Sequence, residues 1–145
     1  MDIHRLISAL RYFLLSRHSR GHGIHSPFVY DLIKSVLRSE IPSHVRGRTD
    51  MVRHMMSNIN ASLSVDDQGS GSVFTSSSSR KIAEISRHSS VRRKYGRLLY
   101  NLAAVYNGSE IVEFGTSLGI STMYIALGAP DSEIITVEAD EGLSE

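Results

Sequence analysis

The 145-residue sequence contains no cysteine. A disulfide framework and a thiolate metal site are therefore both excluded. The first residues carry an apolar stripe that Arg5 and Arg11 interrupt, so they lack the continuous apolar block of a signal peptide or a membrane span. We therefore expect a cytoplasmic location without a membrane segment, with an Arg-rich organellar presequence as the alternative.

No lysine or arginine follows Arg97. Residues 1–97 hold all 16 Lys and Arg with 7 acidic residues, whereas residues 98–145 hold 8 acidic residues, so a net charge of +1 hides a formal +9 and a formal −8. The acidic part favours a cationic ligand and disfavours phosphates. The basic part is open to an anionic substrate, to nucleic acid or to neutralisation by the acidic part.

A nucleotide-cofactor site is predicted in the acidic part. Residues 111–122 predict a strand, a glycine turn and the start of a helix, and residues 134–138 predict a second strand. Gly115 and Gly119 let the backbone approach a ligand where a Cβ would collide. The free N–H groups at the start of the helix add a cradle. Glu138, about 20 residues beyond the glycines, is placed to accept hydrogen bonds from a ribose diol.

Charge at this turn argues against a dinucleotide. Glu113 would repel a pyrophosphate, and Ser117 stands where a dinucleotide fingerprint has its second glycine. A nicotinamide oxidoreductase is therefore disfavoured. S-adenosylmethionine carries a sulfonium and an ammonium, so a carboxylate at the mouth of the first strand suits it better.

The pattern Glu-x-Gly-x-x-x-Gly from Glu113 to Gly119 resembles motif I of the class I S-adenosylmethionine-dependent methyltransferases, and its Glu-Phe-Gly-Thr-Ser-Leu-Gly-Ile-Ser form is similar to the O-methyltransferase branch. Residues 22–30, His-Gly-Ile-His-Ser-Pro-Phe-Val-Tyr, and residues 94–99, Lys-Tyr-Gly-Arg-Leu-Leu, look like the amino-terminal region of an uncharacterised bacterial group of these enzymes. The resemblance implies a Rossmann-like sheet of seven mostly parallel strands.

The resemblance also implies roles for individual residues. Gly115, Thr116 and Gly119 would line the methionine end of S-adenosylmethionine, and Ser117 belongs to the same cofactor-binding turn. Glu113 would orient the ammonium directly or through water, and Glu138 would bind the ribose. No residue is assigned to catalysis, and the methyl acceptor is unknown.

The sequence ends just after its second predicted strand, so we expect an α/β amino-terminal fragment with the first β-α-β of the cofactor domain. Such a fragment is expected to bind cofactor weakly, to lack activity and to self-associate. We divide it into an amino-terminal helical segment, a Ser/Gly-rich loop, and helices followed by the incomplete cofactor-binding domain: residues 1–61, 62–79 and 80–145.

Helices are predicted over residues 1–20, from the Ser26 cap to Pro42, from a Ser43 cap to about Ala61, over residues 80–87 and from Ser90 to Tyr106. The third helix is expected to turn Val45, Val52, Met55, Met56 and Ile59 inward. The fifth is expected to turn Tyr95, Leu98, Leu99, Leu102 and Tyr106 inward. Ser121 is expected to cap the helix after the glycine turn.

A non-enzymatic alternative remains: a basic helical module that binds nucleic acid or a partner protein. Its candidate surface holds Arg80, Lys81, Arg87, Arg92, Arg93, Lys94 and Arg97. A solvated basic face explains the same residues, because few aromatic residues are interleaved with them. No metal site is expected: His18, His22 and His25 sit close together, but two ligands on a Gly-rich turn without a nearby carboxylate make a poor metal site.

Overall fold

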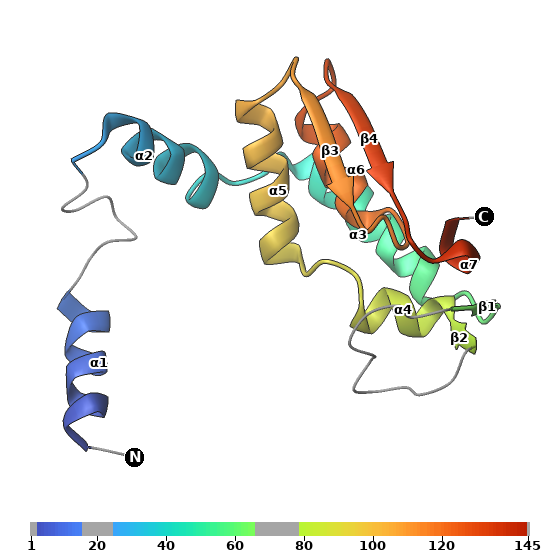
Figure 1. Cartoon of the computed structure of the whole chain (residues 1–145), viewed down its shortest axis with the longest axis horizontal. Coiled ribbons are helices and arrows are strands. Elements are labelled where there is room, and N and C mark those ends of the chain that lie inside the picture. The colour runs from blue at the N-terminus through green and yellow to red at the C-terminus, as the bar shows by residue number, and fades with distance from the viewer. Residues whose placement is uncertain (1–2, 16–24, 66–78, 145) are drawn as a thin grey trace. The chain divides into compact units, whose positions relative to one another are not determined.

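The computed structural model describes residues 3–15, 25–65 and 79–144 (Figure 1). The chain divides into two units, Met1–Ser39 and Glu40–Glu145. The first unit contains α1 (Ile3–Leu15), α2 (Pro27–Leu32) and the π-helix η2 (Ile33–Leu37). The second contains α3 (Ser43–Ser57), β1 (Ser62–Ser64), β2 (Ser79–Lys81), α4 (Ile82–His88), α5 (Arg93–Val105), β3 (Glu110–Phe114), α6 (Ile120–Gly128), β4 (Glu133–Val137) and α7 (Glu141–Ser144). The fold is mixed α/β, as the sequence predicts. Within the described ranges, no helix is long and apolar enough to cross a membrane.

The cap of α2 was predicted correctly. The Val29 N–H donates to Ser26 Oγ at 3.4 Å, and Pro27 is the first helical residue. The helix then widens into η2, where Val36 is buried. Phe28, Val29 and Leu37 are exposed, Phe28 by 63%.

Helix α3 begins and ends differently from the prediction. Pro42 is the N-cap residue, so Ser43 is the first residue of the helix and not its cap. The helix ends at Ser57, before the predicted end at Ala61, and the Arg87 guanidinium donates to the Ser57 carbonyl at 2.8 Å. A basic side chain thereby satisfies a carbonyl of the last turn.

The inner face of α3 was also predicted only in part. Val45 is buried, but Met55 is 57% exposed. Thr49 takes a place in the core instead, because its hydroxyl donates to the carbonyls of Val45 and Arg46 at 3.0 and 3.1 Å. A polar side chain can be buried here because the helix itself satisfies it.

The ends of the predicted Ser/Gly-rich loop are strands. β1 pairs antiparallel with β2, with Ser62 opposite Lys81. Residues 66–78 of the predicted loop lie outside the described residues. The pairing continues into α4, because the Ile82 N–H donates to the Ala61 carbonyl at 3.0 Å and the Ala83 N–H to the Ile59 carbonyl at 3.2 Å. Backbone carbonyls therefore satisfy donors at the start of α4.

Helix α5 turns a different face inward from the one predicted. Its buried positions are Gly96, Asn101 and Ala103, whereas the expected Tyr95 and Leu102 are exposed. Small residues face the core because α6 lies close against α5. A Cβ on Gly96 would lie 2.3 Å from Cε2 of Tyr124, so the absence of a side chain makes room for the tyrosine ring.

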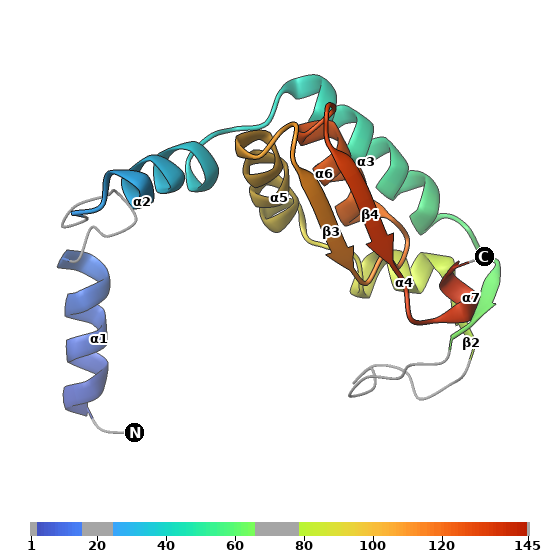
Figure 2. The same ribbon diagram turned by 45° about the horizontal axis from the view of Figure 1, so that its top comes forward.

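The second unit is layered around a two-stranded parallel sheet. β3 pairs with β4 in register, from Glu110 opposite Glu133 to Phe114 opposite Val137. Helices α5 and α6 cover one face of this sheet (Figures 1 and 2). Helix α3 packs on the outer side of α6. The two buried clusters between these layers contain Ile41, Val45, Ile120 and Tyr124, and Ala103, Ile125 and Ala129.

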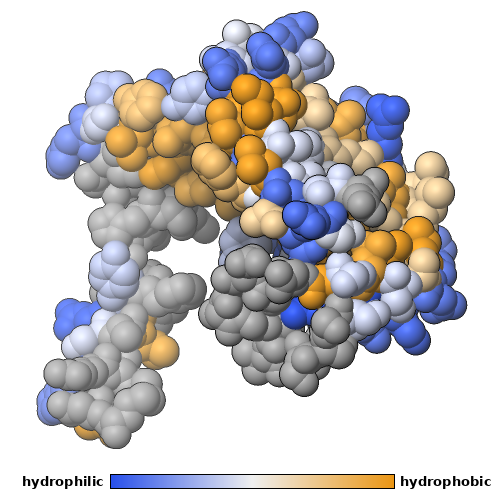
Figure 3. Space-filling model, turned by 45° about the vertical axis from the view of Figure 1, so that its right-hand side comes forward, coloured by the Kyte–Doolittle hydropathy of each residue, from blue (hydrophilic) through white to orange (hydrophobic). Residues whose placement is uncertain are grey.

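The other face of the sheet is apolar and open. Side chains alternate between the two faces of a strand, so the residues that point away from the helices share this face. Phe114 is 84% exposed. Val112, Ile135 and Val137 are also exposed, and apolar patches are visible at the surface in the space-filling view (Figure 3).

Candidate functional site

The glycine turn joins β3 to α6 through left-handed backbone. Gly115 has φ of 89°, Gly119 has φ of 69° and Ser117 has φ of 46°. The Gly115 N–H donates to the Val137 carbonyl at 2.8 Å, which fixes the turn to the end of β4. A Cβ built on either glycine would meet nothing within 4 Å. The turn therefore needs glycine for its conformation, and it borders space that the chain does not fill.

Glu138 lies against this turn. Its Oε2 accepts the Ser117 N–H at 2.6 Å, and its Oε1 accepts the N–H groups of Ala139 at 2.9 Å and Asp140 at 3.1 Å. These backbone donors, the Ser117 N–H foremost, lower the pKa of Glu138 from its ordinary value of 4.5. The carboxylate expected to bind a ribose thus already joins the tip of β4 to the glycine turn.

Glu113 is held by hydroxyl groups. It lies on the helix-covered face of β3, where its Oε2 accepts hydrogen bonds from the hydroxyls of Thr122 in α6 and, at 3.0 Å, of Thr136 in β4. Thr136 Oγ1 lies 2.6 Å from Thr116 Oγ1 in the turn. A chain of hydrogen bonds therefore connects the Glu113 carboxylate to the glycine turn.

The capping role predicted for Ser121 is wrong. Gly119 is the N-cap residue of α6, and no side chain caps that helix. The Thr122 hydroxyl, one residue beyond Ser121, donates to Glu113 and does not cap the helix either. The first N–H groups of α6 consequently remain without a side-chain cap.

Sequence reasoning missed two residues of this region. Thr136 stands directly opposite Glu113 in the β3–β4 register, a signal that appears once the two strands are aligned. Asp140 is buried, and neither of its carboxylate oxygens has a hydrogen-bond partner among the described residues. Its backbone N–H donates to Glu138 Oε1 at 3.1 Å, so a second carboxyl group lies close to the end of β4.

The structure thus brings the predicted site residues Glu113, Gly115, Thr116, Ser117, Gly119 and Glu138 together at one edge of the sheet. A metal cluster is not part of this arrangement. No group of three or more His, Asp or Glu residues suited to a metal occurs in the ranges that the structure describes. His18 and His22 lie outside those ranges.

Neither the scan against protein-family models nor the searches of curated proteins and of solved structures found a match for this chain.

Proposed function

We propose that this chain is the S-adenosylmethionine-binding part of a class I methyltransferase, with β3, α6 and β4 as the first β-α-β of a Rossmann-like domain. One observation carries the proposal: two carboxylates are tied to a single glycine turn that borders unfilled space, Glu138 by a direct hydrogen bond from Ser117 and Glu113 through the hydroxyls of Thr136 and Thr116. Two carboxylates at one turn match a cofactor that carries two positive charges and a ribose.

In this proposal the turn binds the cofactor's methionine end. The first N–H groups of α6 have no side-chain cap, so they are suited to the cofactor's carboxylate. Glu113 attracts the ammonium directly or through water. When bound, the cofactor supplies an electrophilic methyl group on its sulfonium.

In the same proposal, Glu138 binds the ribose of the cofactor. A carboxylate has about four lone-pair sites, and three backbone N–H groups use part of this capacity. A ribose diol would share the carboxylate with these donors or displace the Ser117 N–H. The backbone donors keep Glu138 ionised, which is the form that accepts a hydrogen bond from each hydroxyl of a diol.

Cofactor choice is tested by calorimetry on the 145-residue chain. We expect binding of S-adenosylmethionine and S-adenosylhomocysteine and no binding of NAD, because the carboxylates repel a pyrophosphate. Glu138→Ala should weaken binding by about 1–3 kcal/mol if Glu138 binds the ribose. Binding of NAD without affinity for S-adenosylmethionine would refute the proposal.

The matched control is Glu141→Ala. Glu141 has the same side chain as Glu138, lies in the first turn of α7 and is exposed, so its removal changes the charge near the site without removing the proposed contact. We expect it to leave affinity nearly unchanged. Equal losses in the two variants would show that only the general negative field matters and that Glu138 makes no specific contact.

A further inference from the structure

A cavity of about 320 Å³ lies on the helical side of the second unit, between the beginnings of α3 and α5. Its apolar lining is provided by Ile41 and Tyr124. Its polar lining is one carboxylate, Glu40, and four cationic side chains: Arg46, Arg93, Lys94 and Arg97. The cavity therefore combines an apolar surface with an excess of positive charge.

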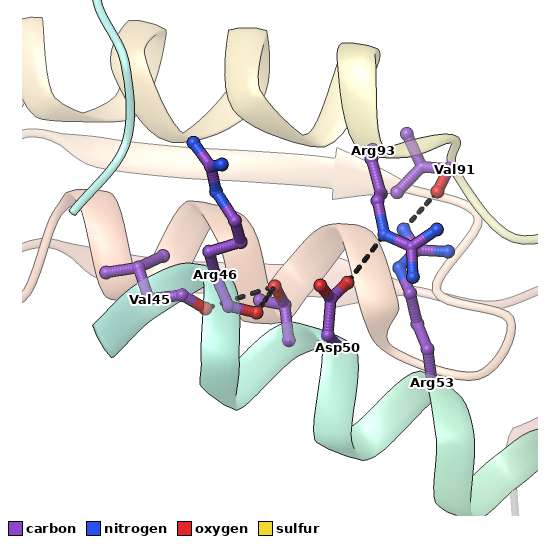
Figure 4. Close-up of polar contacts among 7 residues, drawn as sticks. Val45, Arg46, Asp50, Arg53, Val91 and Arg93 are labelled. Atoms are coloured by element: carbon purple, nitrogen blue, oxygen red, sulfur yellow. Dashed lines mark hydrogen bonds and ion pairs between the residues drawn. The ribbon is translucent and has the colours of Figure 1, made fainter. Parts of the chain in front are cut away.

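Ion pairs hold the three arginine side chains around the cavity. Glu40 accepts hydrogen bonds from Arg46 at 3.1 Å and from Arg97 at 2.5 Å. Arg93 donates to Asp50 at 2.6 Å, and this hydrogen bond raises the pKa of the guanidinium. Figure 4 shows Arg46 and Asp50 projecting from α3 and Arg93 meeting Asp50 from the start of α5. Residues from two helices thus converge on one place.

The apolar part of the cavity is rigid. Tyr124 is only 1% exposed, and its ring lies under Gly96 with the Arg53 guanidinium 5.8 Å from the ring centroid. The Arg53 guanidinium also donates to the Val91 carbonyl, which anchors it between α3 and the segment before α5 (Figure 4). A buried aromatic ring held from both sides forms a rigid floor beneath the cavity.

We propose that this cavity binds a small organic phosphate, with the phosphate among Arg46, Lys94 and Arg97 and an apolar group against Ile41 and Tyr124. The four cations are paired with two carboxylates, Glu40 in the lining and Asp50 beside Arg93, so a formal charge of about +2 remains, which suits a dianion better than a single negative charge. Guanidinium groups match the oxygens of a phosphate in pairs, and lysine adds a point charge. The cavity has room for a ligand with an aromatic ring.

The structure favours this site over an extended nucleic-acid surface. Arg93, Lys94 and Arg97 come from the basic segment predicted to be a solvated face, but Arg46 joins them from another helix and the four line one cavity. A compact group of cations around one cavity suits a small anion, whereas a nucleic-acid backbone requires a groove or stripe of charge. The cavity shares no lining residue with the glycine turn, so the proposal is independent of cofactor binding.

The test is binding of phenyl phosphate to the 145-residue chain by calorimetry and amide NMR shifts, with inorganic phosphate and benzyl alcohol as partial probes. Phenyl phosphate should bind at least about tenfold more tightly than inorganic phosphate, because its ring covers apolar surface. Benzyl alcohol, which lacks the charge, should not bind detectably. The shifts should centre on residues 93–97 and 124.

Two variants locate the phosphate. Lys94→Gln removes an exposed cation from the cavity, and Arg46→Gln removes a guanidinium from α3. Each substitution should weaken the affinity for phenyl phosphate about tenfold, as expected for the loss of a hydrogen bond to a charged group. The control is Arg48→Gln, which removes an exposed arginine of the same helix outside the cavity lining and should leave binding unchanged. Far-ultraviolet circular dichroism verifies that each variant is folded.

Four outcomes would overturn the proposal. The first two are that phenyl phosphate fails to bind and that it binds no better than inorganic phosphate. The third is that Arg48→Gln loses as much affinity as Lys94→Gln, which would indicate a general charge effect. The fourth is that a short single-stranded oligonucleotide displaces phenyl phosphate with an affinity that Arg48→Gln also lowers, which would assign the basic residues to a nucleic-acid surface.

Discussion

Replacing Gly96 by alanine measures how tightly α5 packs on α6. The new Cβ would lie 2.3, 2.5 and 2.7 Å from three ring carbons of Tyr124, whereas carbon atoms in contact lie about 3.5–4.0 Å apart. The nearest ring atom would have to move by roughly 1.2 Å within a close-packed interior. Such overpacking costs about 1–3 kcal/mol, while alanine in place of a helical glycine contributes about 1 kcal/mol in the opposite direction. We therefore expect Gly96→Ala to lower the free energy of unfolding by up to about 2 kcal/mol.

The matched control for this change is Gly47→Ala. Gly47 lies inside α3, and a Cβ there would meet nothing within 4 Å. Only the higher helix propensity of alanine acts at this position, so Gly47→Ala should raise the free energy of unfolding by about 0.5–1 kcal/mol. Because the propensity term is common to both variants, the difference between them isolates the contact with Tyr124.

Urea unfolding of both variants, followed by circular dichroism, checks this reasoning. Tyr124→Leu removes the ring, so Gly96→Ala should be much less costly in that background than in the natural chain. If Gly96→Ala in the otherwise unchanged chain had the same free energy of unfolding as Gly47→Ala, the explanation would be refuted. The same cost with and without the ring would also refute it, because the contact would then not be its cause.

Two further predictions concern the β3–β4 sheet. The pKa of Glu138 is lowered in the folded chain, so its contribution to stability should be complete above pH 4.5 and should disappear as the pH falls through the folded pKa. Urea midpoints measured from neutral to acidic pH should show this loss in the natural chain and not in Glu138→Gln; parallel profiles would contradict it. The open apolar face should cause self-association, and Phe114→Ser should reduce it in sedimentation experiments while the exposed change Met51→Ser, on α3, should not. A natural chain that stays monomeric at high concentration would contradict this prediction.

The glycine turn could be predicted because its signals are local. A strand, two glycines and a helix occur within a few residues of sequence, and the bounds of β3, α6 and β4 agree closely with the pattern. The partners of Glu113 could not be predicted in this way. Thr122 and Thr136 become its neighbours only when α6 folds onto the sheet and the strands take their register.

The helical part was harder to predict for a related reason. Apolar periodicity indicated that α3 and α5 exist, but it assigned Met55 and Tyr95 to the interior, where the structure has Thr49 and Gly96. Whether a helix buries a large or a small residue depends on how close its neighbour lies, which single-helix periodicity does not contain. The strand β2 was missed because Ser-Arg-Lys has little strand propensity and pairs only through contact with β1.

The first N–H groups of α4 donate to carbonyls that lie about twenty residues earlier in the chain. The formation of this helix therefore depends on a distant segment. With 7 residues, α4 is too short to persist alone in water. Its early hydrogen bonds require Ile59 and Ala61 to be in place, so the chain between Ala61 and Ile82 must close first. Each doubling of the length of this loop adds about 0.6 kcal/mol to the free-energy cost of closing it, which slows closure about threefold. Lengthening the Ser/Gly-rich segment should therefore raise the free-energy cost of forming α4, but only slightly.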